Sequence, residues 1–234
     1  MKPVAIVQHV ANDGPSYFAT WLQAQGLPYR VFAMHLGASL PSSTDAFSGL
    51  CILGGPMSAN DPLPYFAALE DLIREAVVQR IPVIGHCLGG QLLSKALGGR
   101  VGRAEHAEIG WSSLRPVHAD ACAWLGDTPT LPLFQWHAES FSIPAGATHL
   151  LRGEHCTNQA FVVDDMHLGM QFHCEVDHAK VLSWLQEGAQ DIAASDSPGV
   201  QDPDTIVRHL DIDLQRSQSI ASTLYARWAR NLRR

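Results

Sequence analysis

The heptapeptide GHCLGGQ, residues 85–91, constrains the fold of this 234-residue chain more tightly than any other stretch. It lies between the apolar run 81–84 and residues 91–97, whose composition favours a helix. A strand that runs through a glycine into Cys87 and then directly into a helix is typical of a nucleophile elbow, a strained turn that lifts one side chain clear of the backbone. The glycines of the heptapeptide let the strand and the helix approach closely. Free N–H groups at the start of the helix would favour the reactive thiolate form of Cys87.

Four other cysteines supply the alternative interpretation, in which Cys87 is a small buried apolar residue. Cys51 lies in the apolar run 50–53 and is interpreted as core, and no glycine-rich turn surrounds Cys122 or Cys156. Only Cys87 has an elbow, so we take it as the candidate nucleophile. An odd number of cysteines without framework spacing argues against a disulfide scaffold and for a reducing compartment.

Length and composition are those of a globular protein with one sizeable core. The N-terminal segment turns polar at Gln8 and lacks a signal-peptide pattern, and no apolar stretch reaches the roughly 20 residues of a membrane span. We therefore expect a soluble, cytoplasmic protein that has no membrane partner. The net charge of −7 gives no support to nucleic-acid binding.

The C-terminal end differs in charge from the rest of the chain. From Arg208 onward six arginines face two aspartates, so this stretch carries +4 and the remainder −11. Apolar residues recur there at helical intervals, which predicts an amphipathic helix. We interpret its basic side as a solvated face, and a docking surface for an acidic partner is the weaker alternative. The stripe consists of Ile206, Leu210, Leu214, Ile220, Leu224 and Trp228.

Strand and helix patterns alternate along the first half of the chain, which predicts an α/β fold with a mostly parallel central sheet flanked by helices. Short runs between residues 101 and 172 predict added antiparallel strands. We expect one domain over residues 1–234, with a C-terminal helical extension over about 202–234. Strands are predicted at 4–7, 29–33, 50–53 and 81–84, and helices at 16–25, 63–79 and 177–188.

The segment MQFHCEV, residues 170–176, supplies a proton shuttle for the thiol. If this segment is a strand, His173 and Glu175 project to the same side, because side chains alternate along a strand. One nitrogen of His173 could then face Cys87 while the other donates to Glu175. Alone, a histidine two residues before a glutamate is weak evidence, but together with an elbow cysteine it indicates nucleophilic catalysis.

With these motifs the chain resembles the class I glutamine amidotransferase family, whose members have an elbow of the GxCxGxQ type and a later HPE-type segment. Further matches are GGPMSAND at 54–61, EIGW at 108–111 and WHAESFSIP at 136–144. The pattern is similar to the stand-alone branch, which resembles GMP synthase glutaminase domains without a synthetase domain. The resemblance implies a flavodoxin-like class I glutaminase fold.

The resemblance also implies roles for individual residues. Cys87 would be the nucleophile, His173 the general base and acid, and Glu175 the residue that orients His173. The backbone N–H groups of Gly55 and Leu88 would form an oxyanion hole, in which each donor is worth about 3 kcal/mol. Two further residues are assigned to substrate binding, namely Gln91 and His137. No cofactor and no metal are implied.

One departure from the family pattern concerns Cys174, which stands where the family has proline between the histidine and the glutamate. The absence of this proline removes a stiffening residue next to His173 and Glu175. By strand alternation Cys174 should point away from Cys87, so we interpret it as structural. His86, beside Cys87, is interpreted as a packed or hydrogen-bonded residue of the elbow, not as a second base.

Three functions remain after this reasoning. The first is hydrolysis of the glutamine side-chain amide through a Cys87 thioester, with ammonia passed to a separate synthetase or released. The second keeps the chemistry but takes larger γ-glutamyl amides, as a γ-glutamyl peptidase or hydrolase would. The third, a module that binds zinc through Cys87, His173 and Cys174, lacks the usual ligand spacing.

Overall fold

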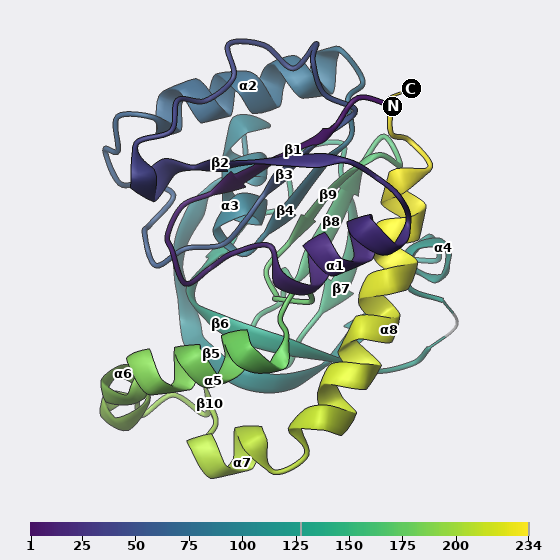
Figure 1. The fold of residues 1–234 in the computed structure, drawn as a ribbon. Coiled ribbons are helices and arrows are strands. Elements are labelled where there is room, and N and C mark those ends of the chain that lie inside the picture. The colour runs from purple at the N-terminus through teal and green to yellow at the C-terminus, as the bar shows by residue number, and fades with distance from the viewer. Residues whose placement is uncertain (127, 234) are drawn as a thin grey trace.

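A computed structural model describes residues 1–126 and 128–233, and its centre is one mixed β-sheet with helices on both faces (Figure 1). The α/β fold class expected from the sequence is confirmed. The strands are β1 (Val4–Gln8), β2 (Tyr29–Ala33), β3 (Gly49–Ile52), β4 (Val83–His86), β5 (Val101–Pro116), β6 (Leu131–Phe141), β7 (Thr148–Arg152), β8 (Ala160–Val163), β9 (His167–Met170) and β10 (Gly199–Val200).

The sheet has a parallel half and an antiparallel half that meet at β9. In the parallel half the order is β2, β1, β3, β4, β9, and every neighbouring pair is parallel. From β9 the sheet continues through β8, β7 and β5 in antiparallel pairs. The long strands β5 and β6 form an antiparallel pair with a register shift between Arg103 and Glu108. The added antiparallel strands expected between residues 101 and 172 are confirmed.

Both faces of the parallel half are apolar, because helices cover both. Along β1, Val4 and Ile6 pack into one hydrophobic cluster, whereas Ala5 and Val7 pack into another on the opposite face. This alternation is the two-residue period of a strand, and the unbroken apolar run that it produces is typical of buried parallel strands.

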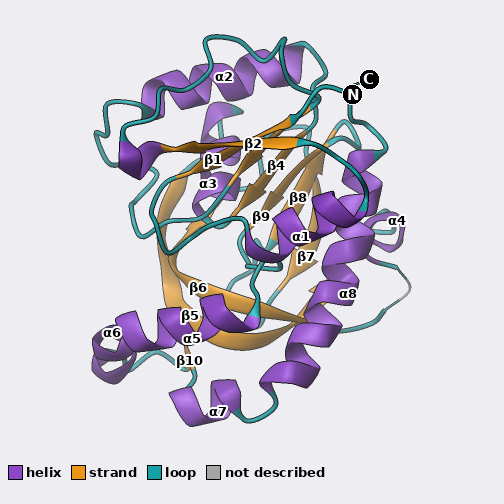
Figure 2. Cartoon of the chain, viewed as in Figure 1, coloured by secondary structure: helices purple, strands orange, loops and turns teal. Residues whose placement is uncertain are grey.

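The helices divide between the two faces, as Figure 2 shows. Helices α2 and α3 cover one face, and α1 and α8 cover the other. Within residues 1–126 and 128–233, none of the helices has the length and apolarity required to cross a membrane. They are α1 (Ser16–Ala24), the 3₁₀ turn η1 (Met34–Leu36), α2 (Phe66–Val78), α3 (Leu88–Ala96), α4 (Ala121–Leu125), α5 (His178–Glu187), α6 (Ala189–Ala194), α7 (Pro203–Val207) and α8 (Leu210–Ala229).

The C-terminal stretch folds as predicted for its apolar stripe, with a break at residues 208 and 209. Ile206 is on α7 and the other members of the stripe are on α8, and all of them are buried. After α8 the chain returns to the amino end of the sheet. There the Arg233 N–H donates to the Ser48 carbonyl, and the Ser48 N–H donates to the Pro3 carbonyl. Residues near the two chain ends are thus joined through Ser48.

The strand predicted at 81–84 lies two residues later, as β4 over Val83–His86, and two further predicted elements differ from the structure. Helix α2 begins at Phe66, three residues later than predicted, because the segment before it forms a turn in which the Leu63 N–H donates to the Asp61 carbonyl. The second difference concerns 171–175, which were predicted to continue a strand. Strand β9 ends at Met170, and the following residues form bends, a single bridge and a turn.

Candidate active site

Cys87 occupies the turn between β4 and α3, as the elbow motif predicts. Its backbone has φ 47° and ψ −108°, a region that residues with a Cβ rarely adopt. Such a conformation costs on the order of 1–3 kcal/mol and persists only where the surroundings enforce it. The strain is therefore borne by the cysteine itself and not by the neighbouring glycines.

The glycines of the motif are required by close packing. A Cβ on Gly85 would lie 2.4 Å from the backbone of Gly89. A Cβ on Gly89 would lie 2.1 Å from the carbonyl oxygen of Ile52 on β3, and one on Gly90 would lie 2.3 Å from that of Met170 on β9. The start of α3 therefore rests directly on three adjacent strands, and this contact fixes the position of the Cys87 side chain.

His173 and Glu175 meet as predicted, but not through strand alternation. His173 Nδ1 lies 2.7 Å from Glu175 Oε1, and both side chains are buried. The backbone N–H of His173 donates to the carbonyl of Phe134 on β6, which anchors the segment where it leaves β9. The strand predicted at this point is wrong, and a turn brings the two side chains together.

The charges in this buried pair reinforce one another. Burial lowers the pKa of the His173 imidazole, but the charges of Glu175 and Cys87 outweigh that effect and hold the pKa well above its ordinary value. Burial raises the pKa of the Glu175 carboxyl, but the positive charges of His173 and Lys180 hold it well below its ordinary range. Glu175 is therefore an ionised carboxylate, and His173 is a strong base that is stabilised as imidazolium.

Five of the predicted site residues line one cleft of about 660 Å³. They come from the loops that follow the carboxyl ends of β3, β4 and β9 and from α3 and β6, the edge at which open α/β sheets bind ligands. Leu88 and Glu175 are not among the lining residues, and Glu175 reaches the cleft through His173. The five lining residues are Gly55, Cys87, Gln91, His137 and His173.

Gly55 and Leu88 lie beside each other at this edge. A Cβ on Gly55 would be 3.2 Å from Leu88 Cδ2, so the turn after β3 contacts the first residue of α3. Within the described residues, no hydrogen-bond acceptor is found for the backbone N–H of either residue. Two unpaired donors at this edge of the cleft can stabilise an anion that forms there.

The thiol has two polar neighbours in addition to His173. Gln171 Nε2 lies 3.5 Å from Cys87 Sγ, and Cys87 Sγ lies 3.8 Å from the carbonyl oxygen of Trp136. Gln91 Nε2 donates to the Glu139 carbonyl at 3.2 Å and lies 3.3 Å from Gln171 Oε1. The predicted residue Gln91 thus belongs to a chain of side chains that ends at the sulfur.

His137 belongs to a second buried network at the wall of the cleft. Its Nε2 lies 3.1 Å from Glu108 Oε2, and its Nδ1 lies 3.1 Å from the Glu139 carbonyl oxygen. Gln159 Nε2 donates to the same Glu108 oxygen at 2.7 Å. Both ring nitrogens of His137 are therefore engaged by the protein, which fixes the orientation of the ring.

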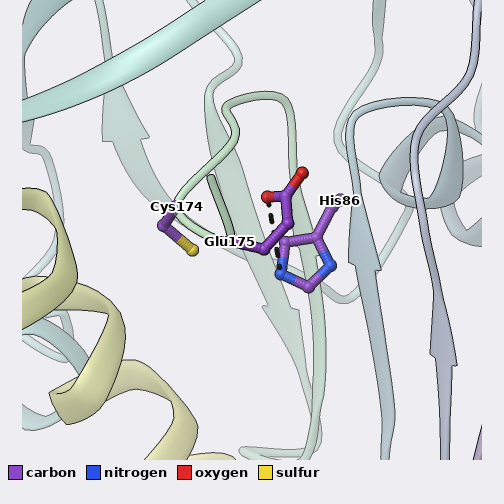
Figure 3. A group of neighbouring side chains, drawn as sticks. All are labelled: His86, Cys174 and Glu175. Atoms are coloured by element: carbon purple, nitrogen blue, oxygen red, sulfur yellow. Dashed lines mark ion pairs between the residues drawn. The ribbon is translucent and has the colours of Figure 1, made fainter. Parts of the chain in front are cut away.

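His86 and Cys174 have the structural roles that the sequence predicts. His86 Nε2 lies 3.1 Å from the Tyr225 hydroxyl and 3.9 Å from Glu175 Oε2, and the dashed line in Figure 3 marks the contact with Glu175. Burial lowers the pKa of His86 to about 4, so the ring is neutral at physiological pH. Cys174 Sγ lies 3.3 Å from the Tyr225 hydroxyl, and burial raises the pKa of its thiol.

Within the described part of the chain, two groups of side chains are close enough together to share a metal ion. One is His86, Cys174 and Glu175, and the other is Glu108, His137 and Cys156. Neither group contains Cys87 or His173, so the zinc ligand set of the third hypothesis does not converge.

Sequence reasoning missed several residues of this site. Gln171 stands two positions before His173, where its proximity to the motif was the available signal. Asp13 follows β1 at the same edge as the elbow, which is a positional signal for a functional residue. Lys180, on α5, is buried and lies 2.6 Å from Asp13 Oδ1. The sequence contains no pattern that links Lys180 to the site.

Comparison with known proteins agrees with this geometry. The family model for class I glutamine amidotransferases matches residues 22–187. A glutamine amidotransferase-like protein, YfeJ, of Salmonella typhimurium is 30% identical over 199 residues, which make up 81% of this chain and 82% of the relative. One subunit of the glutamine-hydrolysing GMP synthase from Sulfolobus acidocaldarius is 32% identical over 136 residues, or 57% of this chain and 70% of that relative.

A solved structure is similar over the whole chain. The crystal structure of a glutamine amidotransferase from Methylobacillus flagellatus covers 100% of this chain and 96% of its own, with a TM-score of 0.98 and 46% identity. The match of the family model covers well over half of the chain, and both the Salmonella relative and the solved structure match over most of their own length. The chain therefore belongs to the class I glutamine amidotransferase family.

Proposed function

We propose that this protein hydrolyses the side-chain amide of glutamine through a thioester on Cys87 and releases glutamate and ammonia. The observation that carries the proposal is the strained elbow cysteine, which lines one cleft together with His173, a buried histidine whose Nδ1 is 2.7 Å from a carboxylate oxygen. A nucleophile, a base and a residue that orients the base are the elements of nucleophilic amide hydrolysis.

The reaction proceeds in two steps. His173 takes the thiol proton, and the Cys87 thiolate attacks the carboxamide carbon, so that a C–S bond forms and the carbonyl oxygen becomes an anion. The imidazolium then gives its proton to the amide nitrogen, and the C–N bond breaks to release ammonia. In the second step His173 takes a proton from water, the hydroxide adds to the thioester, and the C–S bond breaks to give glutamate while the imidazolium returns its proton to the Cys87 sulfur.

The remaining site residues stabilise or hold the substrate. The N–H groups of Gly55 and Leu88 donate to the oxyanion, which is worth about 3 kcal/mol for each donor. Gln91 and His137 line the same cleft as Cys87 and are assigned to binding the rest of the glutamine molecule, His137 through its ring surface, since Glu108 and Glu139 engage both ring nitrogens. Glu175 holds the tautomer of His173 that presents its other nitrogen to Cys87.

The ammonia acceptor is proposed to belong to a separate protein. One relative is named as a subunit of a glutamine-hydrolysing GMP synthase, which indicates that chains of this kind can serve a separate synthetase. We propose that residues 1–234 act as one amidotransferase-like domain with a C-terminal helical extension over about 202–234. All five cysteines are free thiols, which suits the reducing cytoplasm that we propose as its location.

The size of the cleft favours a second candidate, hydrolysis of larger γ-glutamyl amides. The cleft volume of about 660 Å³ lies within the range of roughly 300–1,000 Å³ that is typical of pockets for drug-sized ligands. Such ligands are larger than glutamine. The cleft extends from Cys87 to Asp191 and Ser195 beyond α5. Comparing the turnover of glutamine with that of a γ-glutamyl dipeptide distinguishes the two substrates.

The nucleophile is tested by replacing Cys87 with serine or alanine. Either variant should lose glutamate release, whereas Cys122→Ser, which changes the exposed cysteine, should retain it. A glutamine-analogue electrophile should add its mass to the peptide that contains Cys87. If Cys87→Ala keeps most of its rate, or the label falls on another residue, the assignment is wrong.

A further inference from the structure

Behind the His173–Glu175 pair lies a buried ion pair that the thioester mechanism does not use. Lys180 Nζ is 2.6 Å from Asp13 Oδ1, 2.6 Å from the Gly14 carbonyl oxygen and 3.6 Å from Glu175 Oε1. The side chains of Lys180 and Asp13 are only 3% and 4% exposed. Burying an ion pair costs desolvation energy, so a stabilising role alone does not explain it.

The ion pair is also part of the wall of the cleft. Asp13 lines the cleft, and a Cβ on Gly54 would lie 2.5 Å from Asp13 Oδ2, so the carboxylate supports the turn that carries Gly55. The ring of Trp184 packs edge-on against His173 and also lies 5.2 Å from Lys180 Nζ. The loop after β1 and helix α5 are thus joined around the back of the catalytic pair.

The net charge of the buried side chains Asp13, Lys180, Glu175 and His86 depends on Asp13. Glu175 and Asp13 each contribute −1, Lys180 contributes +1, and His86 is neutral at physiological pH because burial lowers its pKa to about 4. The buried group therefore carries one surplus negative charge while His173 is neutral. It becomes electrically balanced when His173 accepts the proton of Cys87. Without Asp13, the ammonium of Lys180 would cancel the charge of Glu175 and oppose the imidazolium.

We propose that Asp13 is a positioning residue of the catalytic centre, which neutralises Lys180 so that the negative charge of Glu175 remains available to the His173 imidazolium. Lys180 in turn fixes Glu175 Oε1 and the loop after β1. This inference rests on the proposed function, because it assumes that His173 becomes positively charged during the reaction.

The test compares the single variant Asp13→Asn with the double variant Asp13→Asn/Lys180→Met. The single variant keeps the shape of the side chain and leaves the ammonium uncompensated. A change of one unit in the pKa of His173 corresponds to about tenfold, so kcat should fall by about tenfold or more while KM changes little. The double variant removes both charges of the ion pair and restores the surplus of −1. It should recover most of the lost kcat, although it has lost more contacts.

A second readout needs no substrate. The rate at which iodoacetamide modifies Cys87, measured by peptide mass relative to the exposed Cys122, reports how readily the thiolate forms. The ratio should fall in Asp13→Asn and recover in the double variant. Glu70→Gln is the matched control, because Glu70 pairs at 3.1 Å with Lys95 in the last turn of α3 and neither residue lines the cleft, so the ratio should be unchanged.

The outcomes separate this inference from the proposed function. If Cys87 of the wild-type protein is no more reactive than Cys122, the proposed function fails. If Cys87 is reactive but the double variant is as impaired as Asp13→Asn or worse, the charge-balance inference is overturned while the proposed function stands. A rise in KM at unchanged alkylation ratio would instead assign Asp13 to substrate binding and would also overturn it.

Discussion

Replacing Cys87 with glycine should give a more stable protein than replacing it with alanine. Both substitutions remove the thiol, so the comparison isolates the effect of the Cβ on the elbow backbone. At φ 47° and ψ −108° a residue with a Cβ stores about 1–3 kcal/mol of strain, which glycine does not. Glycine loses about 0.5–1 kcal/mol more than alanine through its greater freedom in the unfolded state.

The difference leaves the glycine variant more stable by about 1 kcal/mol, which for a chain of this length corresponds to a rise of about 2–4 °C in Tm. Thermal unfolding and urea titration of the two variants measure it. As a control, Ala68→Gly at an exposed position of α2 should lower stability by about 1 kcal/mol. If Cys87→Gly is less stable than Cys87→Ala by a similar amount, the elbow is not strained and the reasoning is refuted.

Two further predictions concern packing and pH. Gly89→Ala would bring its Cβ to 2.1 Å from the Ile52 carbonyl oxygen and should lower the free energy of unfolding by about 1–3 kcal/mol or more. Gly102→Ala is the control, because its Cβ meets open space and should change the stability little. Equal urea midpoints of the two variants would contradict the close contact at Gly89. Burial lowers the pKa values of His9, His86 and His167 to about 4. Between pH 6.5 and 4 the unfolded chain therefore binds more protons than the folded protein. Lowering the pH through this range should decrease the free energy of unfolding, by up to about 1.4 kcal/mol per pH unit for each histidine. His167→Asn, which keeps an acceptor for the Val83 N–H, should reduce the slope by one histidine's share, and a slope that the substitution leaves unchanged would show that His167 does not titrate in this way.

The elbow could be predicted from the sequence because its determinants are contiguous. A strand, a helix and the glycines between them stand within a few residues of Cys87, and each has a local physical reason. The apolar runs of the parallel strands are equally local, since both faces of these strands are covered. The meeting of His173 and Glu175 was predicted correctly on a wrong premise, because a turn after Met170 and not a strand brings them together.

Contacts between distant segments could not be predicted in this way. Asp13 and Lys180 are 167 positions apart, and their pairing depends on how α5 packs against the loop after β1. The same holds for Gln159, which precedes β8 and donates to the Glu108 carboxylate that contacts His137. A single sequence records the residue types but not which of these buried charges share a neighbour.

The position of α8 bears on how the chain is made. This helix and the residues after it cover one apolar face of the sheet, and Arg233 binds Ser48 at the start of β3. These residues follow the strands and α1 in the chain, so during synthesis the strands and α1 emerge earlier, with that face uncovered. Until α8 docks, the nascent chain presents apolar surface of the kind that chaperones bind. Completion of this face therefore waits for the synthesis of α8, although Cys87 emerges more than 100 residues earlier.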